Sequence, residues 1–490
     1  MNRPNNLCWL KCCSSLATFF LAVLLVSGNC LAQMERYELG KRLRRFEQAW
    51  QLAIEEQRKP SGAIMQEAVR NFFSLNLLGA AQKLDDAYFA VNDQPATSWL
   101  RAVATYRVRT SKRMLDEKAD TVSVSLDRFY KTNFAIAPDL TVNWEVSDLN
   151  GKSILSRGAT WAESLEGVDL NVKELRPGDY WLRGTVQRED KTFALPEMLL
   201  SRIDELDATL SKLEEASRSE KSQLDATVRA TIKDHLALLK SIQNGTTPES
   251  DFPAFRIVTS DLKLMSSNEG SVGQLIAQYA TEADQWITLT SGKRKVPVRL
   301  RAPQNQSTHK MPVLFLFHGA GGSENMFFET YGAGQAVTEG LNRGWLVVAS
   351  RQSLMGLGLT CQEMLADLER FFDIDRNQVY LIGHSMGAAQ VIRQATLLPD
   401  LPRAAAVIGG GSASRDGKLL SKIAWYVAAG QLDFGKSGAA GFYQSLKKAE
   451  VPKAKYEEFA DIEHMVIVQA ALPNVFKFFD NASSVPRAAQ

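Results

Sequence analysis

The chain has 490 residues, which is enough for two to four domains. Its 57 basic residues nearly balance its 55 acidic ones, and no basic stripe interleaved with aromatic residues stands out, so nucleic acid is not an expected partner. No cluster of cysteine and histidine has the spacing of metal ligands, and no glycine-rich phosphate loop is present. The sequence therefore predicts neither a metal nor another cofactor.

Residues 1–32 have the pattern of a secretory signal peptide. A positively charged start precedes an apolar core over residues 16–26, and Ala32 offers a cleavage site. The core is shorter than the roughly 20 apolar residues that span a bilayer, so an uncleaved membrane anchor is the less favoured alternative, as is a lipid attached to Cys30. We expect an exported protein, periplasmic or extracellular, cleaved near Ala32.

Cysteine usage limits how the exported chain is stabilised. Four of the five cysteines lie in the segment predicted to be removed, and only Cys361 remains. The mature chain can then form no internal disulfide and must depend on its apolar cores. Cys361 begins an apolar-periodic helical pattern, which favours a packing role over a nucleophilic one.

Two different periodicities follow the signal segment. Residues 33–117 have apolar residues at helical spacing, interrupted at Lys59-Pro60-Ser61-Gly62, which predicts a helical domain. Over residues 118–198 the period changes to two, with turn signals between short runs, which predicts a small all-β, sandwich-like domain. That domain is expected to act as a spacer or to dock the enzyme on a polymer or surface.

Residues 199–284 return to a helical pattern. A heptad-like apolar seam runs over residues 203–239 and fits either a helical hairpin within the chain or a coiled coil between two chains. Self-association through this seam is therefore one of the possibilities that the sequence leaves open. Residues 285–482 are expected to form the last domain, and residues 483–490 a tail.

The last domain contains a strand followed by a glycine-rich loop. The apolar run 311–317 leads into His318-Gly319-Ala320-Gly321-Gly322, which is close to the HGGG-type loop whose backbone N–H groups stabilise an oxyanion. We expect one donor from Ala320 or Gly321. His318 and Gly319 are expected to support the loop rather than to take part in the chemistry.

A second glycine-rich turn provides a candidate nucleophile. The apolar run 379–382 leads into Gly383-His384-Ser385-Met386-Gly387, which matches the G-x-S-x-G elbow between a strand and a helix. Gly383 and Gly387 allow close approach of the two elements, and Met386 is expected to supply the second oxyanion donor. His384 is interpreted as a packing residue.

The base and the acid are found from their order along the chain. In this elbow fold the serine precedes the acid and the acid precedes the histidine, and His464 is the only histidine after Ser385. Asp433 follows a buried apolar run, at the strand end where catalytic groups collect. Asp461 is the alternative acid, but it lies in the same loop as His464, where it is badly placed to orient the ring.

Residues from about 285 to 482 resemble the α/β-hydrolase superfamily, over about two-fifths of the chain. The run 372–387 is similar to that of secreted esterases of the polyhydroxybutyrate depolymerase and feruloyl esterase type, often labelled predicted peptidases. The resemblance implies acyl hydrolysis through Ser385, His464 and Asp433. Several members of that group carry disulfides near the site, whereas this domain has only Cys361, so the resemblance does not carry a substrate with it.

The sequence therefore predicts an exported, multidomain serine hydrolase with a C-terminal α/β-hydrolase domain of mostly parallel strands flanked by helices. The substrate is expected to be a small or polymer-linked carboxylic ester. The intervals between Ser385, Asp433 and His464 are too short for a large inserted lid, which predicts an open site. The alternatives are a peptidase of the prolyl oligopeptidase type and a binding scaffold with a decayed hydrolase domain.

Overall fold

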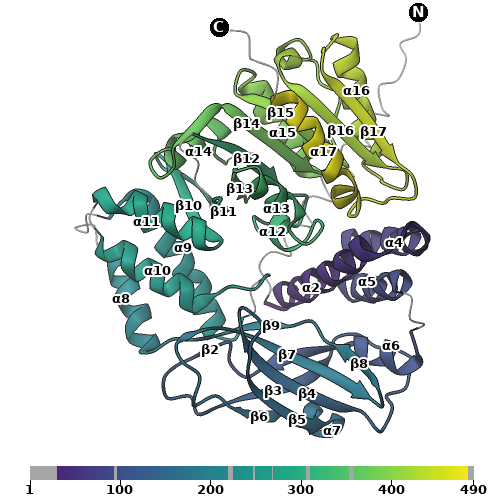
Figure 1. The fold of residues 1–490 in the computed structure, drawn as a ribbon, viewed down its shortest axis with the longest axis vertical. Coiled ribbons are helices and arrows are strands. Elements are labelled where there is room, and N and C mark those ends of the chain that lie inside the picture. Colours follow the sequence, from purple (N-terminus) through teal and green to yellow (C-terminus); the bar gives the residue numbers. More distant parts are fainter. Residues whose placement is uncertain are drawn as a thin grey trace, which may run out of the picture.

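The computed structural model (Figure 1) describes most of the chain in seven stretches, namely 30–92, 96–218, 224–246, 249–267, 269–304, 310–351 and 358–483. Most of the predicted signal segment and nearly all of the predicted tail lie outside the described residues. Within those seven stretches, no helix is both long enough and apolar enough to cross a membrane.

An eight-stranded sheet forms the C-terminal part of the molecule. In spatial order its strands are β10, β11, β13, β12, β14, β15, β16 and β17. Only β11 runs against its neighbours; the other pairings from β13 to β17 are parallel. The bounds are β10 (Gln285–Ser291), β11 (Arg294–Arg301), β12 (Met311–Phe317), β13 (Leu346–Ser350), β14 (Ile374–His384), β15 (Pro402–Ile408), β16 (Ala424–Gly430) and β17 (Ala454–Phe459).

Helices cover both faces of this sheet, which explains why its central strands are almost continuously apolar. One face packs on α14 (Cys361–Leu368), α15 (Met386–Leu397) and α16 (Lys436–Lys448), and Cys361 is buried there as a packing residue. The other face packs on α12 (Met326–Glu329), α13 (Gln335–Asn342) and α17 (Ile467–Ser483). A short 3₁₀ turn, η2 (Leu419–Lys422), precedes β16.

Residues 106–202 form two facing sheets with a common apolar core, as a β-sandwich does. Strands begin at Tyr106, earlier than the expected boundary at 118, because the alternation of the short strand β1 is too brief to separate from the preceding helix. The bounds are β1 (Tyr106–Thr110), β2 (Met114–Leu115), β3 (Thr121–Arg128), β4 (Thr141–Asp148), β5 (Ser153–Thr160), α7 (Trp161–Glu166), β6 (Val168–Asn171), β7 (Gly178–Arg188), β8 (Lys191–Ala194) and β9 (Met198–Arg202).

The remaining helices fall into two groups. In Figure 1, α2, α4 and α5 of the first group and α10 of the second lie between the large sheet and the sandwich. The first group is α2 (Cys30–Leu52), α3 (Glu55–Arg58), α4 (Ser61–Phe73), α5 (Leu77–Val91) and α6 (Ser98–Ala104). The second is α8 (Leu206–Arg218), α9 (Ala226–Gln243), α10 (Ala254–Ser266) and α11 (Glu269–Glu282). The break expected at Pro60 is where α4 begins.

The apolar seam over residues 203–239 is buried within the chain. Leu213, Ile232 and Leu239 are inaccessible to solvent and belong to the same core as the hydrolase sheet. The seam residues therefore pack within the chain, among α8, α9 and α10, as the helical-hairpin alternative predicts. Sequence periodicity does not distinguish these cases, because both bury the same stripe.

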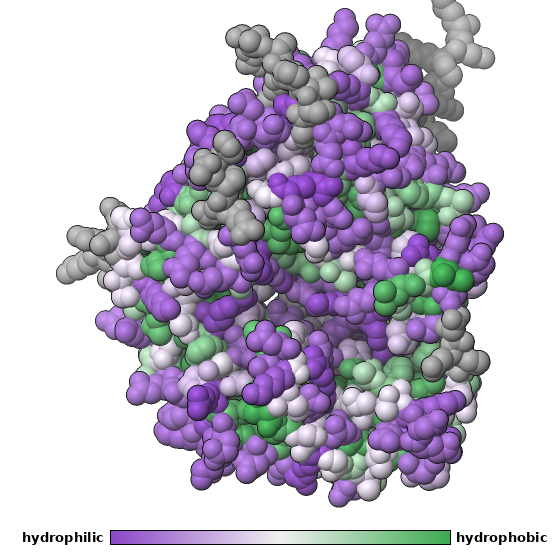
Figure 2. Space-filling view, viewed as in Figure 1, coloured by the Kyte–Doolittle hydropathy of each residue, from purple (hydrophilic) through white to green (hydrophobic). Residues whose placement is uncertain are grey.

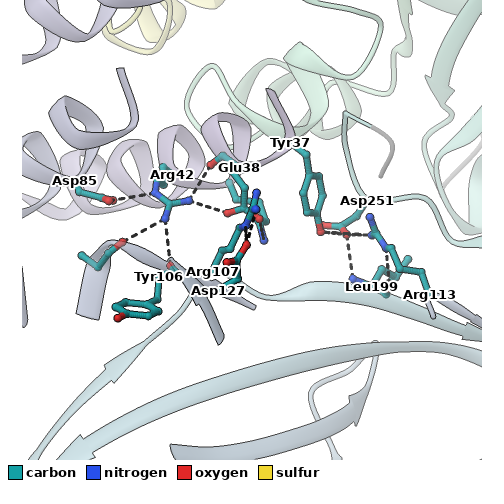
Figure 3. Close-up of polar contacts among 12 residues, drawn as sticks. Tyr37, Glu38, Arg42, Asp85, Tyr106, Arg107, Arg113, Asp127, Leu199 and Asp251 are labelled. Carbon is teal, nitrogen blue, oxygen red and sulfur yellow. Dashed lines mark hydrogen bonds and ion pairs between the residues drawn. The ribbon is translucent and has the colours of Figure 1, made fainter. Parts of the chain in front are cut away.

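A buried ion-pair network fixes α2 against the rest of the N-terminal half (Figure 3). The guanidinium of Arg42, 1% exposed, donates to Asp85 at 3.1 Å and to Glu38 at 2.7 Å. It also donates to the carbonyls of Ala104 and Tyr106, both at 3.2 Å. Burial opposes the charge of Arg42, but these acidic partners raise its pKa above the ordinary value.

The first turns of α2 make a second set of contacts, also visible in Figure 3. Asp251 accepts hydrogen bonds from the Tyr37 hydroxyl at 2.8 Å, the Arg113 guanidinium at 2.8 Å and the Leu199 N–H at 3.0 Å. This aspartate lies just before α10, so α2, the sandwich and the second helical group meet at one carboxylate.

The other side of α2 contacts the hydrolase domain. Glu47 accepts from the Gly332 N–H at 3.1 Å, and the Gln51 amide donates to the Gly332 carbonyl at 2.7 Å. Arg44 forms an ion pair with Glu329. The view in Figure 2 is mainly hydrophilic and is hollowed near its middle, below the hydrolase domain.

We expect Arg42→Met to lower the free energy of unfolding by about 3 kcal/mol, because it breaks buried ion pairs and leaves acceptors without their strongest donor. Arg44→Met is the matched control on the same helix. We expect it to cost no more than about 1 kcal/mol, since Arg44 is 39% exposed and Glu329 keeps its pair with Arg299. Urea unfolding measures both, and equal losses would contradict the assignment.

Candidate active site

Ser385 lies at the sharp turn between β14 and α15. Its backbone has φ 56° and ψ −114°, a region that non-glycine residues rarely occupy and that costs of order 1–3 kcal/mol. The Ser385 N–H is held by the Ile408 carbonyl of the neighbouring strand at 2.9 Å. The turn therefore presents the serine above the carboxyl end of the sheet, directly before the N-terminus of a helix.

The two elbow glycines are required by steric contact. A Cβ on Gly387 would lie 1.9 Å from the Phe317 carbonyl oxygen, and one on Gly383 would lie 2.2 Å from the Gly387 carbonyl oxygen. No side chain fits at either position without moving backbone. The strand, the elbow and α15 can approach this closely only because both residues are glycine.

His464 lies in the loop between β17 and α17, and the structure brings it together with Asp433. Its Nδ1 is 2.7 Å from Asp433 Oδ1, and both side chains are buried. Since a carboxylate accepts, Nδ1 carries the proton and Nε2 is the basic nitrogen of the ring. Asp461, the alternative acid, is half exposed and faces Lys59 at 3.7 Å instead.

Asp433 follows β16 and is tuned to remain charged. Burial alone would raise its pKa, but the hydrogen bond and attraction from His464, together with the Gly435 N–H at 2.6 Å, lower the pKa below the usual value. A carboxylate in this state can fix the tautomer of His464 and stabilise its protonated form.

The glycine-rich loop lies beside the serine. Gly319, Ala320, Gly321 and Ser385 line the same cavity, and Met386 opens the helix whose N-terminus points at this turn. His318 Nδ1 is 2.7 Å from the carbonyl of Gly319, so its ring holds the start of the loop. The expected oxyanion donors and the candidate nucleophile are thus brought to one place.

His384 links the base to the loop, together with Tyr331, a residue that the sequence did not indicate. His384 Nε2 is 2.7 Å from the His464 carbonyl, and its Nδ1 is 2.7 Å from the Tyr331 hydroxyl. Burial and the neighbouring His464 lower the pKa of His384 to about 3, so its ring is neutral. Nε2 must then donate to the carbonyl, and Nδ1 accepts from Tyr331.

Tyr331 in turn accepts the Gly319 N–H at 3.3 Å. One chain of hydrogen bonds therefore connects the oxyanion loop, the elbow and the loop that carries His464. His384 and Tyr331 are positioning residues, because they act on the backbone of these loops.

The site is covered, contrary to the open site expected from the sequence. Helix α4 lies across it: the Gln66 amide donates to the Leu432 carbonyl at 3.1 Å, and Phe72 contacts the loop at Gly321. Phe73 packs edge-on against the His464 ring. The sequence argument considered only insertions between the site residues, whereas the cover comes from the other end of the chain.

Two buried glutamates lie behind the base loop. Glu463 accepts the N–H groups of Met465 and Val466, both at 2.7 Å, at the start of α17. Burial raises its pKa to about 7, with a further contribution from the charge of Asp433. Burial raises the pKa of Glu47 on α2 to about 8, with a further contribution from the charge of Glu463. Glu47 thus connects α2 to the loop at Gly332, whereas Glu463 stabilises the backbone that follows His464. Among the described residues, no group of three or more acidic, histidine or cysteine side chains could hold a metal ion.

The strand order of the sheet, its single antiparallel strand and the serine elbow after the central strand define an α/β-hydrolase fold. Neither a protein-family model nor a curated protein matches the sequence.

Several solved structures are similar to the chain. A ferulic acid esterase is 18% identical with a TM-score of 0.35, covering 41% of this chain and 98% of its own. An S-formylglutathione hydrolase from Staphylococcus aureus is 16% identical with a TM-score of 0.34, covering 40% and 98%. A thermostable esterase is 11% identical with a TM-score of 0.38, covering 76% and 99%.

We expect Tyr331→Phe to lower kcat about tenfold with little change in KM. The variant leaves His384 Nδ1 and the Gly319 N–H without their partner, and such a loss is worth about 1–1.5 kcal/mol. Tyr380→Phe is the matched control, since its buried hydroxyl binds Gln378, away from the cavity. Steady-state kinetics of both variants on one ester measure the effect. Equal losses of kcat would contradict the positioning role of the Tyr331 hydroxyl.

We expect Glu47→Gln to flatten the pH dependence of stability. Folding raises the pKa of Glu47, so the contribution of its protonated form to the free energy of unfolding is intact below about pH 4.5 and is lost as the pH rises towards about 8. One such proton gives a slope of at most about 1.4 kcal/mol per pH unit. In thermal melts from pH 5 to 9, the melting temperature should decline less for Glu47→Gln than for Glu55→Gln, whose side chain is exposed. Identical profiles for the two variants would contradict a raised pKa at Glu47.

Proposed function

We propose that the protein is a serine hydrolase that cleaves carboxylic esters. The observation that carries the proposal is the conjunction at one cavity of a serine in a strained elbow turn and a histidine bound to a buried aspartate. An elbow retained only as a fold feature would not need a buried acid with a lowered pKa beside the base.

In the proposed mechanism, Ser385 Oγ attacks the ester carbonyl carbon while His464 Nε2 takes its proton. The N–H groups of Met386 and of Ala320 or Gly321 stabilise the oxyanion. Collapse of the tetrahedral intermediate breaks the ester bond, and His464 returns the proton to the leaving alcohol. Water then attacks the acyl-enzyme by the same route, releasing the acid and restoring Ser385, while Asp433 stays ionised throughout.

The other expectations remain proposals. We propose that the chain is exported with residues 1–32 removed, and that the β-sandwich spaces or docks the hydrolase domain. The peptidase alternative has less support, because the strands described over residues 106–202 form two facing sheets rather than the repeated blades of a propeller.

The test is the intact mass of the protein after reaction with a fluorophosphonate. We expect one adduct on the wild type and none on Ser385→Ala, while Ser323→Ala, a change of the same kind in the same cavity, keeps the adduct. Ester turnover should fall about 10⁶-fold for Ser385→Ala and about 10⁴-fold for Asp433→Asn. A folded wild type that forms no adduct would contradict the proposal and favour a binding scaffold.

A further inference from the structure

The cavity at Ser385 has two walls that come from opposite ends of the chain. The glycine-rich loop, Ser385 and His464 form one wall. The other belongs to α2, α4 and α5, which we call the cap. The cap residues that line the cavity are Arg36, Leu39, Gly40, Leu43, Met65, Ala68, Val69, Phe72, Phe73, Ala80 and Leu84.

The cap wall is almost entirely apolar. Its only charged side chain in the cavity is Arg36, near the N-terminal end of α2, and most of the others belong to the core that joins the three helices. Glu249 and Ser250, from the segment before α10, line the cavity beside Gly40 of α2. The rest of the polar lining lies on the opposite wall, where the chemistry is proposed to occur. An apolar wall facing a few convergent polar groups is the usual composition of a small-molecule site.

The cavity is small, with a volume of about 160 Å³. An apolar cavity of about 150 Å³ in another protein holds a benzene molecule, whereas sites for drug-sized ligands span about 300–1,000 Å³. The room beside Ser385 therefore fits one aromatic ring or an unbranched chain of about four to six carbons. A long lipid chain does not fit.

The position of the cap indicates which half of an ester it contacts. Phe72 reaches the glycine-rich loop, its ring 3.0 Å from the position that a Cβ on Gly321 would take. The loop holds the carbonyl of the acyl group, so the cap continues from the acyl side. On the side of His464, which protonates the leaving alcohol in the proposed mechanism, the cap residue Phe73 also packs edge-on against the imidazole. Phe434 packs on the same ring at 3.9 Å between ring centroids and is 61% exposed, so this side is the more open to solvent.

We propose that the cap is the acyl-binding pocket and selects esters with an apolar acyl group of this size, with the alcohol directed to the open side. The inference rests on the proposed function of Ser385. It assigns substrate selection to residues about 300 positions away from the nucleophile in sequence.

The test compares Ala68→Leu with Ala63→Leu. Ala68 lines the cavity and is buried, whereas Ala63 lies on the same helix and is exposed. Each variant is assayed on p-nitrophenyl acetate, butyrate, hexanoate, octanoate and benzoate, and on acetates of ethanol, butanol and hexanol. The first series varies the acyl group and the second varies the alcohol.

We expect the wild type to prefer butyrate, hexanoate and benzoate over octanoate. Ala68→Leu should lower kcat/KM about tenfold or more for hexanoate and benzoate relative to acetate, because the added methyl groups occupy the pocket. The ratios of kcat/KM among the acetates of ethanol, butanol and hexanol should not change in Ala68→Leu. Ala63→Leu should change no ratio in either series. Met65→Ala shortens a side chain of the same wall and enlarges the pocket, so it should raise the ratio of kcat/KM for octanoate to that for butyrate about tenfold.

Each contrary outcome overturns a distinct statement. Unchanged acyl ratios in both Ala68→Leu and Met65→Ala would overturn the acyl pocket, and ratios that change only in the alcohol series would place the alcohol there. Reaction of each variant with a small ethyl fluorophosphonate is measured in parallel. A wild type that does not react with this probe would overturn the proposed function. Variants that react with the probe but keep the wild-type acyl ratios would overturn only this inference.

Discussion

The attachment of α2 to both halves of the molecule is the constraint on which the site depends. A guanidinium buried as deeply as that of Arg42 is tolerated only with full compensation, and here two carboxylates and two carbonyls supply it. Because three of these acceptors come from α5, the end of α6 and the start of β1, the helix cannot rotate or slide without leaving charges unpaired. The opposite side of the helix is then held at a fixed place against the hydrolase domain.

That placement explains how a site with ordinary α/β-hydrolase parts becomes enclosed. The hydrolase domain by itself provides the serine elbow, His464 and the glycine-rich loop, all at the carboxyl end of the sheet. The cap adds Phe72 at the loop and Phe73 at the imidazole. Excluding water from this region strengthens the electrostatic interactions within it.

Local signals in the sequence were enough to identify the residues that the structure brings together. Ser385 and Asp433 follow the buried strands β14 and β16, His464 follows the partly exposed edge strand β17, and strand ends of a parallel sheet meet at one edge. Tyr331 and Glu47 had no such signal, because their importance comes from contacts with His384 and Gly332 that are distant in sequence. The cover over the site was also missed, because it is made by helices distant in sequence from Ser385. The start of the sandwich was placed too late, because five residues of alternation at Tyr106–Thr110 are too few to be decisive.

The hydrogen bond between Gln66 and the Leu432 carbonyl joins residues 366 positions apart. Contacts of this separation close very large loops and form slowly compared with local ones. During synthesis the covering helices leave the ribosome several hundred residues before the loop that carries His464. The apolar face of the cap is therefore exposed without its partner wall while the intervening residues are made, and a chaperone that covers it in that interval would prevent aggregation.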